Sequence, residues 1–160
     1  MRGTVHQLAA KWVVGLLKEK DIPFQICGGL AAKGYGAERE LNDIDLFVPG
    51  EHFSSVVQAG QAYISKPATH YCEEGWDLTY VQFKYEGIKI EVGNADGAQI
   101  FDAANEAWVP LNIEFDRYTT VNLLGLELPL MLKEELIRYK SVLSRPVDID
   151  DIRAMRERSK

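Results

Sequence analysis

The chain has few cysteines and histidines, and those it has are scattered. Its two cysteines, Cys27 and Cys72, indicate two unrelated thiols in a reducing compartment rather than a disulfide framework. His70 and Cys72 stand two residues apart, as some zinc ligands do, but no second pair completes a set of four. We therefore expect a cytoplasmic protein without a structural zinc site.

Basic excess and long apolar runs are also missing. With 24 acidic and 18 basic residues the net charge is -6, whereas proteins that bind long nucleic acids normally carry a basic footprint. A surface with net negative charge suits a neutral or cationic small molecule better than a long nucleic acid. The sequence contains no run of about 18 apolar residues, and residues 1–20 lack the apolar centre of a signal peptide. We expect neither a membrane anchor nor an export signal.

What is present is the composition of a folded domain. Hydrophobic residues make up 46% of the chain and charged residues 26%, and 160 residues are enough for one domain, residues 1–160, with a real core. Apolar periodicity, together with turn residues, predicts both helices and strands. The expected helices are 5–20, 28–33, 51–60, 130–143 and one after Pro146 capped by Asp148; the expected strands are 24–27, 43–48, 78–83, 88–92 and part of 109–121. A hairpin turn is expected at 86–87 and a further turn at 124–126.

The most informative segment combines a glycine pair with two closely spaced carboxylates. Gly28 and Gly29 follow an apolar strand, and after an interval of thirteen residues, 30–42, a second apolar strand begins with Asp43-Ile44-Asp45. Residues two apart in a strand point to the same side, so Asp43 and Asp45 share one face. Two neighbouring carboxylates repel each other unless a cation lies between them, and Mg²⁺ is commonly held by one or two carboxylates plus substrate phosphates. Glycine, which has no Cβ, lets another group approach the backbone closely.

This segment resembles the signature of the nucleotidyltransferase superfamily of the DNA polymerase β type. Its surroundings are most similar to the small lincosamide-type and aminoglycoside-type nucleotidyltransferases, which place an arginine before an Asn-Asp-Ile-Asp run; here these are Arg39 and the residues 42–45. The likeness continues in the C-terminal part, from Glu134 through Lys140 to Asp151. The resemblance implies an α+β fold, in which a mixed, twisted sheet has helices packed mainly on one side, followed by a short helical C-terminal extension.

The resemblance also implies a third carboxylate on a later strand. Glu91, opposite in direction to the apolar Ile90 and Val92, is the candidate; Asp77 and Glu86 are rivals less well placed within an apolar strand. Many relatives have Asp at this position, and the longer Glu leaves the metal geometry open. On this hypothesis Asp43, Asp45 and Glu91 are the catalytic and metal-binding residues, with one or two Mg²⁺ ions.

Four further residues are predicted to bind the nucleoside triphosphate. Gly28 and Gly29 would offer backbone N–H groups to its phosphates, and Arg39 or Lys140 would neutralise the phosphate tail. Ordinary explanations stay open for each: a turn for the glycines, a surface salt bridge for Arg39, and side-chain packing for Lys140.

The predicted activity is Mg²⁺-dependent transfer of a nucleoside monophosphate from an NTP to a hydroxyl of a small-molecule acceptor. The alternative is a non-enzymatic or degenerate binding module of the same fold that acts on a protein partner, as in toxin–antitoxin pairs or regulatory domains. Modification of a tRNA end or of a protein is a second enzymatic alternative, and the net negative charge counts mildly against the RNA. The third carboxylate separates the first two, because a site without it lacks an acceptor base.

Overall fold

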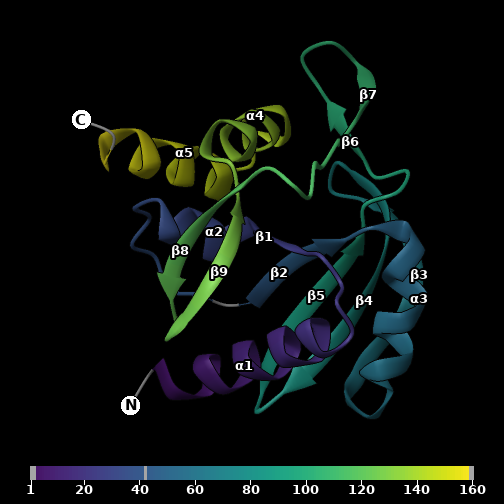
Figure 1. Ribbon diagram of the computed structural model, residues 1–160. Coiled ribbons are helices and arrows are strands. Elements are labelled where there is room, and N and C mark those ends of the chain that lie inside the picture. Colours follow the sequence, from purple (N-terminus) through teal and green to yellow (C-terminus); the bar gives the residue numbers. More distant parts are fainter. Residues whose placement is uncertain (1–2, 42, 159–160) are drawn as a thin grey trace.

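A single mixed sheet organises the chain, and a computed structural model describes it at residues 3–41 and 43–158 (Figure 1). In chain order the elements are α1 (Gly3–Glu19), β1 (Gln25–Cys27), α2 (Gly28–Gly34), β2 (Asp43–Val48), α3 (Gly50–Ala59), the short 3-10 helix η1 (Gln61–Tyr63), β3 (Ile64–Glu73), β4 (Trp76–Tyr85), β5 (Ile88–Asn94), β6 (Gln99–Asp102), β7 (Ala107–Pro110), β8 (Tyr118–Leu123), β9 (Leu126–Met131), α4 (Lys133–Leu143) and α5 (Pro146–Arg158).

The sheet is mixed in strand direction. Its order is β7-β6-β4-β5-β2-β1-β9-β8, in which β6 and β5 pair with different stretches of β4. Strand β3 also pairs with β4 and lies outside this linear order. The pairs β2–β5 and β1–β9 are parallel, whereas the remaining pairs are antiparallel. This arrangement confirms the predicted α+β class with a mixed sheet.

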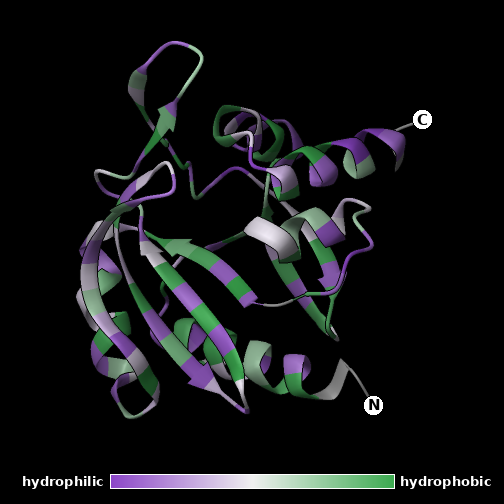
Figure 2. Ribbon diagram, turned by 180° about the vertical axis from the view of Figure 1, so that it is seen from behind, coloured by the Kyte–Doolittle hydropathy of each residue, from purple (hydrophilic) through white to green (hydrophobic). Residues whose placement is uncertain are grey.

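One face of the central strands is covered by α1 and α3. Ile44 and Leu46 of β2 and Ile90 and Val92 of β5 are at most 1% exposed, and α1 and α3 pack against β5. Polar and apolar residues alternate along these strands, as Figure 2 shows from the opposite side. Because side chains alternate between the two faces of a strand, burying this apolar set points the intervening polar residues to the other face.

The other three helices pack on one another. Helix α2 contacts β1 and β2, and α4 and α5 contact each other and α2; Figure 1 shows this group above the β1–β9 side of the sheet. Helix α5 begins at Pro146, a residue whose fixed φ suits a first helical position. Asp148 was predicted to precede this helix as its cap, but it lies in the first turn, where its Oδ2 accepts the backbone N–H of Arg145 at 3.1 Å. Its capping contact therefore comes from inside the helix.

Three hairpins turn through two residues with positive φ. The pairs are Glu74-Gly75, Glu86-Gly87 and Leu124-Gly125. Two successive positive φ values match the type I′ turn, whose twist suits neighbouring antiparallel strands. The hairpin turn predicted at 86–87 is confirmed, and so is the turn predicted at 124–126, of which Leu126 already belongs to β9.

Two further differences between the sequence analysis and the structure concern β9 and β3. Leu130 and Met131 belong to β9, so the predicted helix 130–143 begins only at Lys133. Three apolar residues in a row fit either period, and pairing of Leu130 with Ile26 of β1 and Thr119 of β8 decides for strand. Strand β3 was not predicted, because most of its side chains are exposed on both faces and only pairing with β4 holds it.

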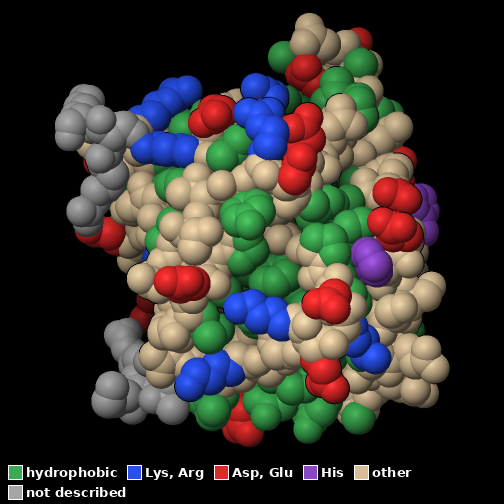
Figure 3. Space-filling model, in the orientation of Figure 1, with side chains coloured by type: hydrophobic (Ala, Val, Ile, Leu, Met, Phe, Trp, Pro, Cys, Tyr) green, Lys and Arg blue, Asp and Glu red, His purple; other side chains and the backbone are tan. Residues whose placement is uncertain are grey.

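The surface in the orientation of Figure 1 mixes charges of both signs around a central group of hydrophobic side chains (Figure 3). Within the part of the chain that the structure describes, no helix is both long and apolar enough to cross a membrane. Cys27 is buried and Cys72 exposed, and both thiols are free, as predicted.

Candidate functional site

The predicted carboxylates meet on neighbouring parallel strands. In the β2–β5 register Asp45 lies opposite Glu91, and Asp43 lies opposite Lys89. All four side chains share the face opposite to the buried Ile44, because residues two apart in a strand point the same way. Asp45 and Glu91 line a cavity of about 300 Å³, which Asp43 does not line. The sheet thus places the three carboxylates on one face, with two of them inside the cavity.

The electrostatics of this face are unfavourable for anions without a cation. Burial, the Glu91 carboxylate and then Asp43 raise the pKa of Asp45 to about 8. Burial and Glu91 also raise the pKa of Asp43, against the lowering influence of Lys89 and Lys66. Repulsion among like charges in a partly buried site disfavours ionisation of each group. A bound cation would relieve that repulsion.

The donor chemistry of these side chains suits a hard divalent ion. Carboxylate oxygens are the ligands that Mg²⁺ takes from proteins, usually one or two of them, with waters and substrate phosphates completing the shell. Over residues 3–41 and 43–158, no three His, Cys, Asp or Glu side chains already converge as a ready metal site. Asp43, Asp45 and Glu91 therefore fit Mg²⁺ by ligand type, and phosphate oxygens would have to supply part of its coordination.

Glutamine 82 fixes the third carboxylate. Gln82 on β4 is buried and donates its side-chain N–H to Glu91 Oε2 at 3.0 Å. The hydroxyl of Ser65 on β3 donates to Gln82 Oε1 at 2.9 Å and orients this amide. The neighbouring strands thereby hold one oxygen of Glu91, and a side-chain hydrogen bond also links Glu91 to Asp45.

The glycine pair makes room for groups of the protein itself. Gly28 has φ +61°, and a Cβ there would lie 2.5 Å from Oδ2 of Asp45. A Cβ on Gly29 would lie 2.8 Å from Nη2 of Arg39. The backbone N–H of Gly28 donates to the Tyr139 hydroxyl at 2.9 Å. Gly28 thus seats Asp45, while phosphate binding by Gly28 and Gly29 stays a prediction.

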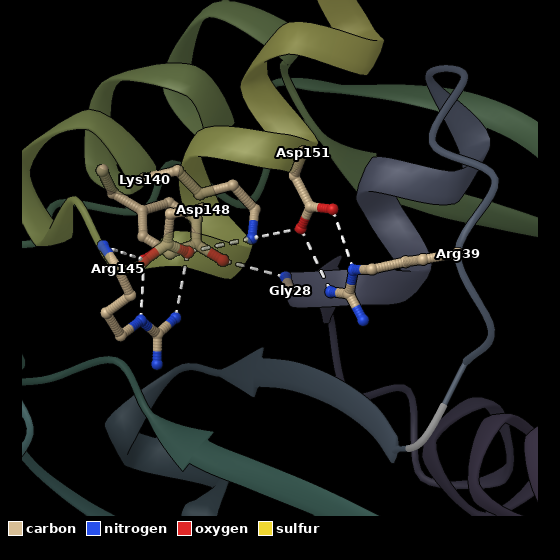
Figure 4. Close-up of polar contacts among 7 residues, drawn as sticks. Gly28, Arg39, Lys140, Arg145, Asp148 and Asp151 are labelled. Atoms are coloured by element: carbon tan, nitrogen blue, oxygen red, sulfur yellow. Dashed lines mark hydrogen bonds and ion pairs between the residues drawn. The ribbon is translucent and has the colours of Figure 1, made fainter.

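Arg39 and Lys140, the two cations predicted to bind phosphate, have carboxylate partners in the structure (Figure 4). Arg39 forms a forked pair with Asp151, with Nε–Oδ1 at 2.8 Å and Nη2–Oδ2 at 3.1 Å. The buried Lys140 ammonium contacts Asp151 Oδ2 at 3.1 Å and Asp148 Oδ1 at 3.4 Å. The salt-bridge interpretation thus describes both residues in this structure. Their binding of phosphate remains a prediction. The predicted motif residue Asn42 lies outside the described residues.

Several cavity residues were not identified from sequence. Tyr139 of α4 and Arg145, which lies between α4 and α5, reach the cavity, and an aromatic wall comes from the β3–β4 hairpin. In this wall Tyr71 meets Tyr80 edge-on, with ring centroids 5.6 Å apart, and Trp76 lies 5.8 Å from Tyr139. Trp76 and Tyr80 are both half-buried and line the cavity. Their alternation with Leu78 on β4 was the available signal, because it puts all three on one face.

Structural comparison finds the same fold in solved nucleotidyltransferases. A provisionally assigned nucleotidyltransferase from Thermotoga maritima matches with TM-score 0.72 and 18% identity, over 92% of this chain and 90% of that one. The aminoglycoside enzyme ANT(2")-Ia, solved with adenylyl-2"-tobramycin, matches with TM-score 0.64 and 16% identity, over 97% and 90%. The lincosamide adenylyltransferase LnuA, solved with lincomycin, matches with TM-score 0.61 and 14% identity, over 94% and 95%.

Sequence comparison adds nothing to this, since no protein-family model and no curated protein matches the chain. Identities of 14% to 18% establish a shared fold, over nine-tenths of each chain or more. The resemblance read from the Gly-Gly and Asp-Ile-Asp segment is confirmed at that level: the chain has the nucleotidyltransferase fold, as found in lincosamide and aminoglycoside adenylyltransferases.

Proposed function

We propose that this protein is an enzyme that transfers a nucleoside monophosphate from an NTP to a hydroxyl of a small-molecule acceptor, with Mg²⁺. The observation that carries the proposal is the register of β2 and β5, which sets Asp45 beside Glu91 in one cavity with Asp43 on the same face. Three mutually repelling carboxylates near the surface of a nucleotidyltransferase fold are poorly explained by stability alone, since like charges destabilise.

Asp43, Asp45 and Glu91 would hold the metal, together with oxygens of the triphosphate. When bound, Mg²⁺ stabilises charge on the attacking and leaving oxygens of an in-line displacement. Asp45 lines the cavity next to Gly28, which has no Cβ to come between them. On this proposal, a nucleotide bound in the cavity brings its phosphates to Asp45.

Glu91 would act as general base. The acceptor hydroxyl loses its proton to Glu91 as its oxygen bonds to the α-phosphorus, and the bond from that phosphorus to the bridging oxygen breaks to release pyrophosphate. The hydrogen bond from Gln82 holds one Glu91 oxygen and keeps the carboxylate directed. The product is an NMP ester of the acceptor.

The aromatic wall formed by Tyr71, Trp76 and Tyr80 would bind either the acceptor or the nucleobase of the NTP through the apolar faces of its rings. The exposed Glu74 at the same cavity adds negative charge near it. An acceptor with a flat apolar face, neutral or cationic, matches this wall. The likeness to adenylyltransferases solved with antibiotics supports a small-molecule acceptor and ATP as the first nucleotide to test.

The test is pyrophosphate release from each of the four NTPs with Mg²⁺, against a panel of hydroxyl-bearing acceptors. We expect turnover that EDTA abolishes and that Asp45→Asn reduces at least about 100-fold, as loss of a key electrostatic group in an active site does. Asp116→Asn, the same chemical change on an exposed loop, should behave like the wild type. NTP binding without turnover for any acceptor would instead support the binding-module alternative.

A further inference from the structure

Five charged side chains join α4, α5 and the segment after α2 into one network. Its members are Arg39, Lys140, Arg145, Asp148 and Asp151 (Figure 4). Three cations face two carboxylates, so the network carries one positive charge in excess. Asp148, Asp151 and Lys140 are at most 2% exposed, and the excess charge can reach solvent only through the two arginines.

The two arginines differ in where they lie. Each has about one-third of its side chain exposed, 34% for Arg39 and 35% for Arg145. Arg145 lines the cavity together with Asp45 and Glu91, whereas Arg39 does not line it. The excess positive charge of the network is therefore presented to the candidate site by Arg145.

The guanidinium of Arg145 is fixed along one edge by Asp148, and its other edge is free within the described part of the chain. Its Nε donates to Asp148 Oδ2 at 2.6 Å and its Nη2 donates to Asp148 Oδ1 at 3.0 Å. Its backbone N–H donates to the same carboxylate at 3.1 Å, so both ends of the residue are fixed. Among the described residues no acceptor is recorded for Nη1. A guanidinium whose orientation is fixed by one carboxylate loses little freedom when its free edge binds another anion.

We propose that Arg145 binds the polyphosphate of the nucleotide. The inference rests on the nucleotidyl-transfer function proposed above and assigns its phosphate contact. Phosphate recognition by arginine is charge-assisted and directional. The two groups that a metal–triphosphate needs, carboxylates for the metal and a cation for the phosphate tail, then line one cavity, the first from the sheet and the second from the start of α5.

Titration calorimetry with Mg²⁺ tests the assignment, using ATP, inorganic tripolyphosphate and adenosine as probes. We expect Arg145→Gln to weaken ATP and tripolyphosphate at least about 10-fold and to leave adenosine unchanged, since a hydrogen bond to a charged group is worth that much. The affinity of Arg145→Lys for ATP and tripolyphosphate should lie between those of the wild type and Arg145→Gln. An ammonium keeps the charge but cannot bind Asp148 and phosphate at the same time as a planar guanidinium can. Arg138→Gln removes the same charge from an exposed position on α4 and should bind like the wild type.

A measurement on the unaltered protein covers the case in which Arg145→Gln does not fold. Phenylglyoxal modifies accessible arginines, and peptide mass spectrometry reports which; Mg²⁺–tripolyphosphate should protect Arg145 and not Arg138. Wild-type affinity of folded Arg145→Gln, or modification of Arg145 unaffected by tripolyphosphate that binds, would overturn the assignment. If the wild type turns over NTP while Arg145→Gln binds it equally well, this inference fails and the proposed function stands. If the wild type binds neither ATP nor tripolyphosphate, both fail.

Discussion

At the scale of single residues, the candidate site depends on very close approach between backbone and side chain. Gly28 has a positive φ, and a Cβ on it would lie only 2.5 Å from Oδ2 of Asp45. A residue with a side chain there is strained in its backbone and also displaces a carboxylate of the site. A side chain on Gly87, which has φ +80°, would cause the same backbone strain, but apart from its chain neighbours no atom of the described residues lies within 4 Å of where its Cβ would be. The two glycines therefore separate strain from displacement.

Gly28→Ala and Gly87→Ala give the first prediction. Each should lower the free energy of unfolding by about 1–2 kcal/mol, the cost of a left-handed backbone with a Cβ. Gly28→Ala should lose more than Gly87→Ala, because Asp45 must also shift, and only Gly28→Ala should reduce pyrophosphate release. Urea unfolding and the turnover assay are the measurements. Equal turnover in the two variants would mean that the seat of Asp45 beside Gly28 does not matter for the reaction.

Glu91→Gln is the second residue-scale prediction. The variant should fold normally, since its side-chain oxygen can still accept the hydrogen bond that Gln82 donates at 3.0 Å. NTP binding should largely persist, because Asp43 and Asp45 remain, whereas kcat should fall by about 10²–10⁴, the usual contribution of a general base. Calorimetry and steady-state kinetics separate the two effects. A wild-type kcat would remove Glu91 as the base.

At the scale of elements, helix α5 is held by buried charge more than by a broad apolar face. Asp151 is 1% exposed and receives both Arg39 and Lys140. Burial alone would raise the pKa of Asp151, but hydrogen bonds from Arg39 and Lys140 and their charges lower it overall. A carboxyl group whose pKa is lowered by folding stabilises the folded state fully at pH values above its pKa in the unfolded chain, which is about 3.9. This contribution is lost as the pH falls through the pKa of the folded state.

The third prediction follows from this sign. Asp151→Asn should lower the free energy of unfolding at pH 7 by about 3–5 kcal/mol, because Lys140 and Arg39 lose a buried partner. As the pH drops below about 4, the wild type should lose its advantage, and the two stability curves should approach each other. Asp150→Asn, on the exposed side of the same helix, should follow the wild type at every pH. Parallel curves for wild type and Asp151→Asn down to pH 2 would contradict the role given to this pair.

Local sequence predicted β1, α2 and β2 and the face shared by Asp43 and Asp45, because those features depend on alternation and on glycine within a few residues. The clean alternation of β5 predicted the face to which Glu91 points, whereas its position beside Asp45 depends on the long-range pairing of β2 with β5 and was expected only from the family resemblance. Arg145 and the aromatic wall were not predicted, because they reach the cavity only after α4 and α5 dock and after β3 pairs with β4. No local pattern reports such long-range contacts.

At the scale of the molecule, the cavity is assembled from segments that span most of the chain, from Cys27 on β1 to Arg145 before α5. The sheet supplies carboxylates, the β3–β4 hairpin supplies an aromatic wall, and the C-terminal helices supply a cation. Ligand binding in such a site joins elements that are distant in sequence, so it should stabilise the whole fold rather than one part.

The last prediction therefore concerns thermal unfolding of the whole protein. A ligand that binds only the folded state at about 100 times its dissociation constant stabilises by about 2.7 kcal/mol. For a protein of this size that corresponds to a rise in Tm of about 5–11 °C. We expect this shift with ATP and Mg²⁺ together, and little shift with ATP in EDTA, because repulsion between the triphosphate and the Asp43–Asp45–Glu91 face is then unrelieved. Asp45→Asn should lose most of the shift, whereas Asp116→Asn should keep it. An equal shift with ATP in EDTA would mean that the nucleotide does not reach the carboxylates through a metal, and the magnesium site would have to be abandoned.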